Sequence, residues 1–159
     1  MLIVSDTSPI TNLIQVNQLE LLNKMFGEIV IPNKVFEELS VYEGHKEEIG
    51  NQDWILIKSV KNKELVKALE KQLDSGEAEA IILAKELEAD LLIIDERKGR
   101  KAAEEYGLKI IGLLGVLIQG KKKGHIDKLK PILDELIEEV GFRVGKKLHE
   151  RILKEIDEE

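Results

Sequence analysis

The 159-residue chain contains no cysteine, and this absence excludes several classes of site. Without thiols there is no disulfide, no thiolate-bound metal and no cysteine nucleophile. The histidines are only three, and they stand far apart without a metal-ligand spacing, at His45, His125 and His149. Any metal ion would therefore be held by oxygen ligands rather than by the nitrogen and sulfur ligands of zinc sites.

The chain also lacks long apolar runs and several well-known motifs. It has no run of 18 apolar residues and no N-terminal signal pattern, so we expect a cytoplasmic protein without a membrane partner. A glycine-rich phosphate loop, a G-x-G-x-x-G motif and a nucleophile elbow are all missing. Nucleotide hydrolysis by those routes therefore has no support.

Aromatic residues make up only 4% of the chain, whereas hydrophobic residues make up 43% and charged residues 35%. This balance is typical of a globular protein, and the length predicts a single domain over residues 1–159. The abundance of Lys and Glu favours a thermophilic source. The net charge of −7 argues against a large non-specific nucleic-acid surface, but cations cluster locally at residues 97–101 and 121–123.

Short apolar runs alternate with helical patterns through the first two thirds of the chain. Strands are predicted at residues 2–5, 29–31, 54–57, 91–94 and 109–111. The segments between them place apolar residues at helical spacing, except that residues 42–53 look polar and irregular. This alternation predicts an α/β fold with a central parallel sheet flanked by helices.

Beyond Gly112 the pattern is purely helical. An apolar helix opens at residues 113–118, a long amphipathic helix is predicted over 126–137, and a last helix over 144–156. We therefore expect an α/β core at residues 1–112 and a helical C-terminal extension at residues 113–159.

Acidic residues directly follow two of the predicted strands. Asp6 follows residues 2–5, and Asp95 and Glu96 follow residues 91–94. The carboxyl ends of strands in open parallel sheets are where ligand sites lie. We expect several carboxylates to gather at this edge, and a divalent metal ion is the simplest explanation for them.

Helical geometry selects further acids from two helices. Glu38 lies about 105° from the centre of the apolar face of its helix, and Glu37 about 155°. Glu77 lies about 60° from the centre of its own buried stripe, and Glu79 about 100°. Glu38 and Glu77 are thus the acids expected to point inward. The alternative for Glu37 and Glu38 is that both are ordinary solvated glutamates. For Glu77 and Glu79 it is that acids in a first turn only complement the helix dipole.

Carboxylates from separate elements, without His or Cys partners, suit Mg²⁺ or Mn²⁺. A cluster of this kind is an arrangement for phosphodiester cleavage, because a divalent ion lowers the pKa of bound water and offsets phosphate charge.

The chain resembles the PIN-domain family, in the branch related to the VapC toxins of toxin–antitoxin pairs. The matching segments are VSDTSPI, IPNKVFEEL, LDSGEAEAI and LLIIDERKGRKAA. The segment GLLGVLIQGKKKGHIDKLKPILDELIEEVGFRV resembles the C-terminal half of a poorly characterised PIN subgroup. Carried over by position, the catalytic and metal-binding acids are Asp6, Glu38, Glu77 and Asp95. The third position is ambiguous between Glu77 and Glu79, and Glu96 is a further candidate beside Asp95.

The resemblance implies a PIN-like fold and metal-dependent cleavage of RNA, single-stranded or structured, with Mg²⁺ or Mn²⁺ as cofactor. It also implies a VapBC-type toxin that forms a homodimer and is inhibited by an antitoxin protein. The substrate-binding residues expected beside the acids are Thr7, Ser8, Arg97, Lys98, Arg100 and Lys101. For the first two helix capping is the alternative, and for the cations a solvated helix face.

Two other functions are compatible with the sequence. One is a non-catalytic PIN-fold module that binds RNA or a protein partner. The other is an assembly protein that acts through its C-terminal helices.

Overall fold

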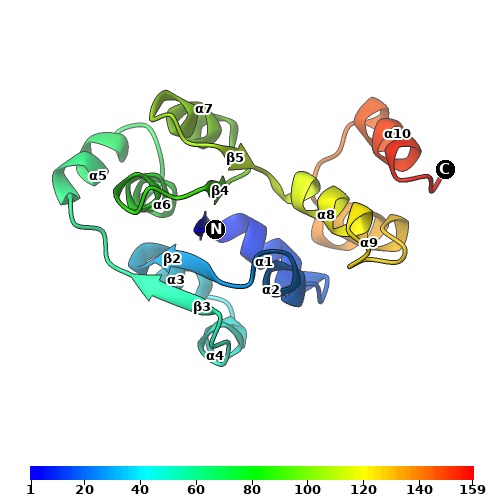
Figure 1. Ribbon diagram of the computed structural model, residues 1–159, viewed down its shortest axis with the longest axis horizontal. Coiled ribbons are helices and arrows are strands. Elements are labelled where there is room, and N and C mark those ends of the chain that lie inside the picture. The colour runs from blue at the N-terminus through cyan, green and yellow to red at the C-terminus, as the bar shows by residue number, and fades with distance from the viewer.

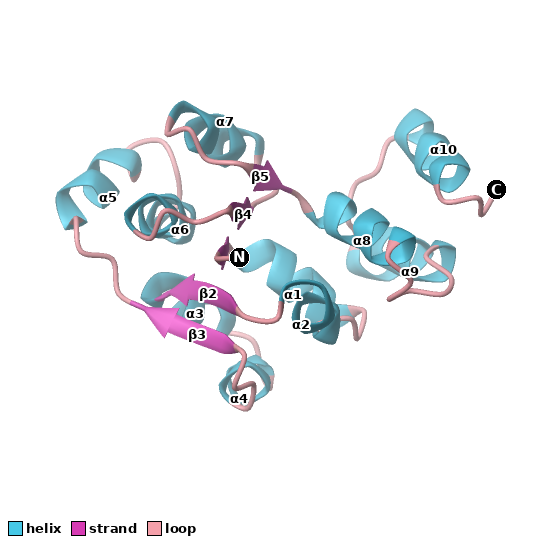
Figure 2. Ribbon diagram, viewed as in Figure 1, coloured by secondary structure: helices cyan, strands magenta, loops and turns pink.

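Five parallel strands form a central sheet in the computed structural model, which describes all 159 residues. The strands are β1 (Ile3–Ser5), β2 (Ile29–Pro32), β3 (Ile55–Lys58), β4 (Leu91–Ile93) and β5 (Ile110–Ile111), drawn in magenta in Figure 2. Their order is β3-β2-β1-β4-β5, and every neighbouring pair is parallel. The predicted parallel α/β fold is confirmed. The direction of winding reverses between β1 and β4, which is where ligands bind in such sheets.

Helices cover both faces of the sheet (Figure 1). One face carries α5 (Lys63–Leu69), α6 (Ser75–Glu86) and α7 (Arg97–Glu105). The helices that share the opposite core are α1 (Thr7–Gln15), α2 (Glu20–Phe26), α3 (Asn33–Leu39), α4 (His45–Gly50), α8 (Leu113–Lys122), α9 (Lys130–Glu135), the π-helix η1 (Leu136–Val140) and α10 (Lys146–Glu155). None of these helices combines the length and the apolar character that crossing a bilayer requires.

Alternation of side chains along the strands separates two cores. Ile3 and Ile93 point into the core shared with α1 and α8, whereas Val4 and Leu92 point into the core under α6. All four are at most 1% exposed. Because both faces are covered, the strands read as continuous apolar runs, as expected for a parallel sheet.

Two of the predicted elements differ in the structure. Residues 45–50 form α4, although the sequence of this segment looked irregular. The helix was missed because Ile49 is its only buried residue, and a single apolar residue makes no periodic pattern. The long helix expected over residues 126–137 begins only at Lys130. Pro131 in its first turn suits a helix start, since proline has no N–H to leave unpaired there.

The last residues of the chain return to the start of α9. Both carboxylate oxygens of Glu158 accept backbone hydrogen bonds, from Leu129 N at 2.8 Å and from Lys130 N at 2.9 Å. Lys121 in α8 forms an ion pair with the same carboxylate at 3.2 Å. Glu158 thus supplies the cap that α9 does not find in its own sequence, where Leu129 occupies the N-cap position.

Replacing Glu158 with Ala should lower the free energy of unfolding by about 1 kcal/mol, the usual effect of losing a helix cap. Urea denaturation would measure the change. The control is Glu159→Ala, which removes the same charge from an exposed neighbour. Equal destabilisation by the two substitutions would show that the cap does not anchor this segment.

Candidate active site

Asp6 lies at the carboxyl end of β1, next to β4. Its backbone N–H donates to Ile93 O at 2.9 Å, so the ladder between the two strands continues up to this residue. The side chain occupies the N-cap position of α1 but makes no capping hydrogen bond. The residue is 4% exposed, and its Oδ1 is buried without a hydrogen-bond partner. Asp6 therefore presents an oxygen without a hydrogen-bond partner at the carboxyl ends of the strands, as predicted.

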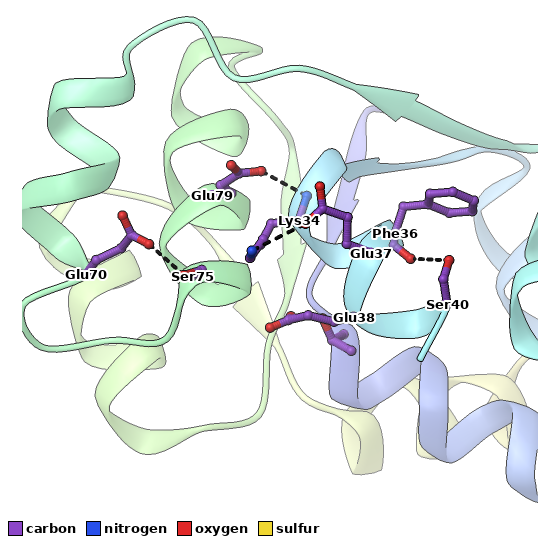
Figure 3. A network of polar contacts seen from close by, with 9 residues as sticks. Lys34, Phe36, Glu37, Glu38, Ser40, Glu70, Ser75 and Glu79 are labelled. Carbon is purple, nitrogen blue, oxygen red and sulfur yellow. Dashed lines mark hydrogen bonds and ion pairs between the residues drawn. The ribbon is translucent and has the colours of Figure 1, made fainter. Parts of the chain in front are cut away.

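Glu38 reaches the same region from α3. Thr7 Oγ1 donates a hydrogen bond to Glu38 Oε1 at 2.6 Å, which orients the carboxylate. Glu37 points to the other side of α3, forms an ion pair with Lys34 at 3.3 Å and is 64% exposed at its side chain (Figure 3). The predicted division between an inward Glu38 and a solvated Glu37 is confirmed.

Glu77 is buried in the first turn of α6, at 6% exposure. It forms a capping box with Asp74: Glu77 N donates to Asp74 Oδ1 at 2.8 Å, and Asp74 N donates to Glu77 Oε1 at 3.3 Å. Its second oxygen, Oε2, is buried and has no partner. The D-x-x-E spacing of a capping box was visible in the sequence and would have identified Asp74 as a neighbour of the site.

Glu79 has a different place. Its Oε1 accepts a hydrogen bond at 3.0 Å from the backbone N–H of Lys34, in the first turn of α3 (Figure 3). Glu79 therefore joins α6 to α3. Of the two alternatives for the third acid, Glu77 is the one whose carboxylate is buried beside Asp6, which it influences electrostatically.

Asp95 follows β4 and caps α8. Its Oδ1 accepts a hydrogen bond from Leu113 N at 2.8 Å, while Oδ2 is buried without a partner. A Cβ added at Gly112 would lie 2.7 Å from Oδ1, so only glycine allows this approach. Glycines allow the same close approach at two other acids. A Cβ added at Gly76 would overlap Glu38 Oε1, and a Cβ added at Gly99 would lie 2.7 Å from Glu77 Oε2.

The acids line two adjoining hollows. Asp6 and Glu38 line a cleft of about 570 Å³, whose further acidic lining residues are Asp74 and Glu96. Asp95 lines a neighbouring cavity of about 730 Å³, which also includes Glu96. Neither hollow is lined by Glu77. In this arrangement no group of three acidic or histidine side chains is disposed to hold one metal ion.

Burial, together with the charge of neighbouring carboxylates, raises the pKa values of the four acids. Burial raises the pKa of Asp6 to about 8, and the nearby carboxylates of Glu77, Asp74 and Glu38 add to this, while the neighbouring backbone N–H of Thr7 opposes it. Burial, followed by the charge of Asp74, raises the pKa of Glu77 to about 7.

The pKa values of Glu38 and Asp95 are also raised by burial. Hydrogen bonds oppose the shift in each case, from the Thr7 hydroxyl to Glu38 and from Leu113 N to Asp95, and Arg100 also opposes it at Asp95.

These features match the donor chemistry of a divalent cation. Three of the four acids keep one buried oxygen without a partner, and an unpaired buried polar atom is unfavourable unless something compensates it. All the donors are hard carboxylate oxygens, which suit Mg²⁺ or Mn²⁺. The same carboxylates would otherwise take up protons, as their raised pKa values indicate.

The predicted substrate-binding residues are only partly brought together. Thr7 and Ser8 line the acidic cleft, and the Thr7 hydroxyl is bound to Glu38. Arg97 and Arg100 line the cavity of Asp95. Lys101 lines a further hollow with Asp95, Arg97 and Arg100. Lys98 lines none of the hollows of the acids and instead lines a separate one with Lys71 and Lys101.

The sequence did not single out several residues around the acids. Val41 and Tyr42, 81% and 49% exposed, line the acidic cleft, and Arg143 lines the neighbouring cavity. The exposed pair follows α3 in a segment without a periodic pattern, so no local signal marked it.

A family model described as a PIN domain matches residues 2–158. Among solved structures, the chain is similar to a PilT N-terminus domain protein, SSO1118, from the hyperthermophilic archaeon Sulfolobus solfataricus P2. The two chains are 20% identical, with a TM-score of 0.47, and the match covers 75% of this chain and 92% of the other. No curated protein matches the chain.

In EDTA, the free energy of unfolding should fall as the pH rises from about 5 to about 8, because the folded state binds protons at Asp6 and Glu77 more tightly than the unfolded state does. The slope can reach about 1.4 kcal/mol per pH unit for each proton. Urea denaturation across this range would measure the slope.

Asp6→Asn should flatten the dependence of the unfolding free energy on pH. Asp53→Asn, at an exposed residue before β3, should leave it unchanged. A stability that rises over this range would contradict the clustering of uncompensated acids.

Proposed function

The chain belongs to the PIN-domain family, whose members are typically nucleases, and we propose that it is a metal-dependent endoribonuclease that cleaves single-stranded RNA. The observation that carries the proposal is the set of buried carboxylate oxygens without partners on Asp6, Glu77 and Asp95. They come from two adjacent strand ends and a helix start, at the switch point of a parallel sheet.

The residues that would hold Mg²⁺ or Mn²⁺ are Asp6, Glu38, Glu77 and Asp95, with Glu96 beside them. When bound, the ion would supply charge to offset that of the phosphate and would lower the pKa of water for attack on phosphorus. The chain's own contacts prepare three of these acids through one oxygen each. Thr7 holds Glu38, Asp74 N holds Glu77, and Leu113 N holds Asp95, so each keeps its second oxygen for a ligand.

The biological role that we propose is that of a VapC-type toxin, which an antitoxin protein restrains and which forms a homodimer. The support is the resemblance of the four acid-bearing segments to that branch of the family. Val41 and Tyr42 are also exposed at the acidic cleft, where they would give a covering protein an apolar contact.

Purified protein incubated with a labelled mixed-sequence single-stranded RNA should cleave it with Mn²⁺ and not with EDTA. Asp6→Asn and Asp95→Asn should each lower the rate by roughly 100-fold or more, because each removes a negatively charged ligand of the ion whose charge would offset that of the phosphate. Glu37→Gln is the matched control, since Glu37 is a solvated neighbour of Glu38 and its loss should leave the rate unchanged.

Cleavage that survives in both Asp variants would identify a contaminating nuclease and refute the assignment. If the wild type does not cleave, the deciding measurement is thermal stability with Mn²⁺, which a bound ion increases by mass action. Stabilisation that is lost in Asp6→Asn would then indicate a metal-binding PIN module without catalysis.

Replacing Gly76 with Ala should lower cleavage by roughly 10- to 100-fold while the protein stays folded. The added Cβ overlaps Glu38 Oε1, so the carboxylate must leave its hydrogen bond with Thr7. Only the end of a flexible side chain has to move, and the unfolding free energy should change by less than about 1 kcal/mol. Gly50→Ala is the control, because no atom lies within 4 Å of its added Cβ. Full activity in Gly76→Ala would show that the position of Glu38 does not matter.

A further inference from the structure

Arginine is rare in this chain, and its distribution is uneven. Only four of the 24 cationic residues are arginines, and the others are lysines. Three of the four, Arg97, Arg100 and Arg143, line the single cavity of about 730 Å³ beside Asp95. The fourth, Arg151, is exposed on α10 and lines neither this cavity nor the acidic cleft.

The guanidinium groups of this cavity have no protein partner. None of the three takes part in an ion pair or in a side-chain hydrogen bond. Arg100 is close enough to Asp95 to oppose the rise of its pKa, but the two side chains form no ion pair. A guanidinium carries five N–H donors in a fixed fork, so the three arginines offer the cavity many free donors, beside the carboxylates of Asp95 and Glu96 that also line it.

The three arginines come from two distant parts of the chain. Arg97 and Arg100 lie three residues apart on α7 and therefore share a face of that helix. Arg143 comes from the turn after η1, where Gly141 adopts a left-handed conformation with φ of 83°. That turn lets Phe142 N donate to Leu136 O at 2.8 Å, and the reversal carries the chain back to the cavity.

The arginine cavity adjoins the acidic cleft. Asn12, Glu96 and Val140 line both hollows, so a chain-like ligand can occupy the two at once. The two hollows differ in charge, since the cleft is lined by Asp6, Glu38, Asp74 and Glu96 and by no cation. An extended polyanion would meet carboxylates without any cation in the cleft, and three arginines beside Asp95 and Glu96 in the arginine cavity.

We propose that Arg97, Arg100 and Arg143 form a subsite for a non-reacting phosphate of an RNA strand whose adjacent phosphodiester lies at the acidic cleft. The inference rests on the proposed ribonuclease function and deepens it. The planar guanidinium fork matches two phosphate oxygens at once, which the point charge of a lysine does not. The subsite makes residues after η1 part of the substrate-binding surface and holds the strand next to the acids.

The test is the affinity of the full-length protein for a fluorescent mixed-sequence single-stranded RNA, measured in EDTA so that no cleavage occurs. Arg143→Ala and Arg97→Ala should each weaken binding by about 10-fold, as expected for the loss of a charged hydrogen bond. The slope of log affinity against log salt should also fall by about 0.7 per lost phosphate contact. Arg143→Lys should restore the salt slope but only part of the affinity, because it keeps the charge and loses the fork.

Arg151→Ala is the matched control, since it removes the same charge from an exposed site outside the cavity. If it weakens binding as much as Arg143→Ala, only net charge matters and the subsite is refuted. Unchanged RNA affinity in Arg143→Ala and Arg97→Ala also refutes it, and leaves the nuclease standing if the wild type still cleaves with Mn²⁺. Arginine-dependent binding without any cleavage would support the subsite and refute the nuclease. A protein that neither binds nor cleaves RNA would refute both.

Discussion

Asp6 and Asp95 follow adjacent parallel strands, and Glu38 and Glu77 approach Asp6 from two helices, so that Asp6 lies among carboxylates in a poorly hydrated region. Such groups repel one another and lose hydration, and both effects favour the protonated form. Each acid nevertheless receives only partial compensation from the protein. A hydroxyl or a backbone N–H binds one oxygen of Glu38, Glu77 and Asp95, and no ion pair neutralises any of them. A divalent cation bound at these carboxylates would supply the electrostatic stabilisation that the protein itself does not.

Glycine makes the arrangement sterically possible. Gly76, Gly99 and Gly112 each lie against one of the carboxylates, and a Cβ at any of them would collide with a carboxylate oxygen. Gly76 and Gly99 lie in the first turns of α6 and α7, and neither has the positive φ that would require glycine. Their presence therefore reflects the close approach of α6 and α7 to the acids rather than local helix preference.

The C-terminal helices are connected to the site at two points. Leu113, the first residue of α8, holds Asp95, and the turn after η1 delivers Arg143 to the neighbouring cavity. Glu158 then fixes the end of the chain on α9, and the apolar residues of α8, α9 and α10 belong to the same core as β1 and β4. A displacement of these helices would move Asp95, because protein cores are densely packed and transmit small displacements.

The local pattern of the sequence was sufficient to predict the parallel α/β fold and the inward direction of the Glu38 and Glu77 side chains. Strand period, helix period and the position of an acid after a strand are properties of neighbouring residues, so they can be read from a single segment. Whether these acids bind a metal stays a prediction. Only the tertiary structure assigned α4, the late start of α9, the capping of α3 by Glu79 and the meeting of Arg143 with Arg97. Apart from the start of α9, which Pro131 also marks locally, each of these depends on contacts between residues far apart in the chain, and such contacts leave no periodic trace in the sequence around either partner.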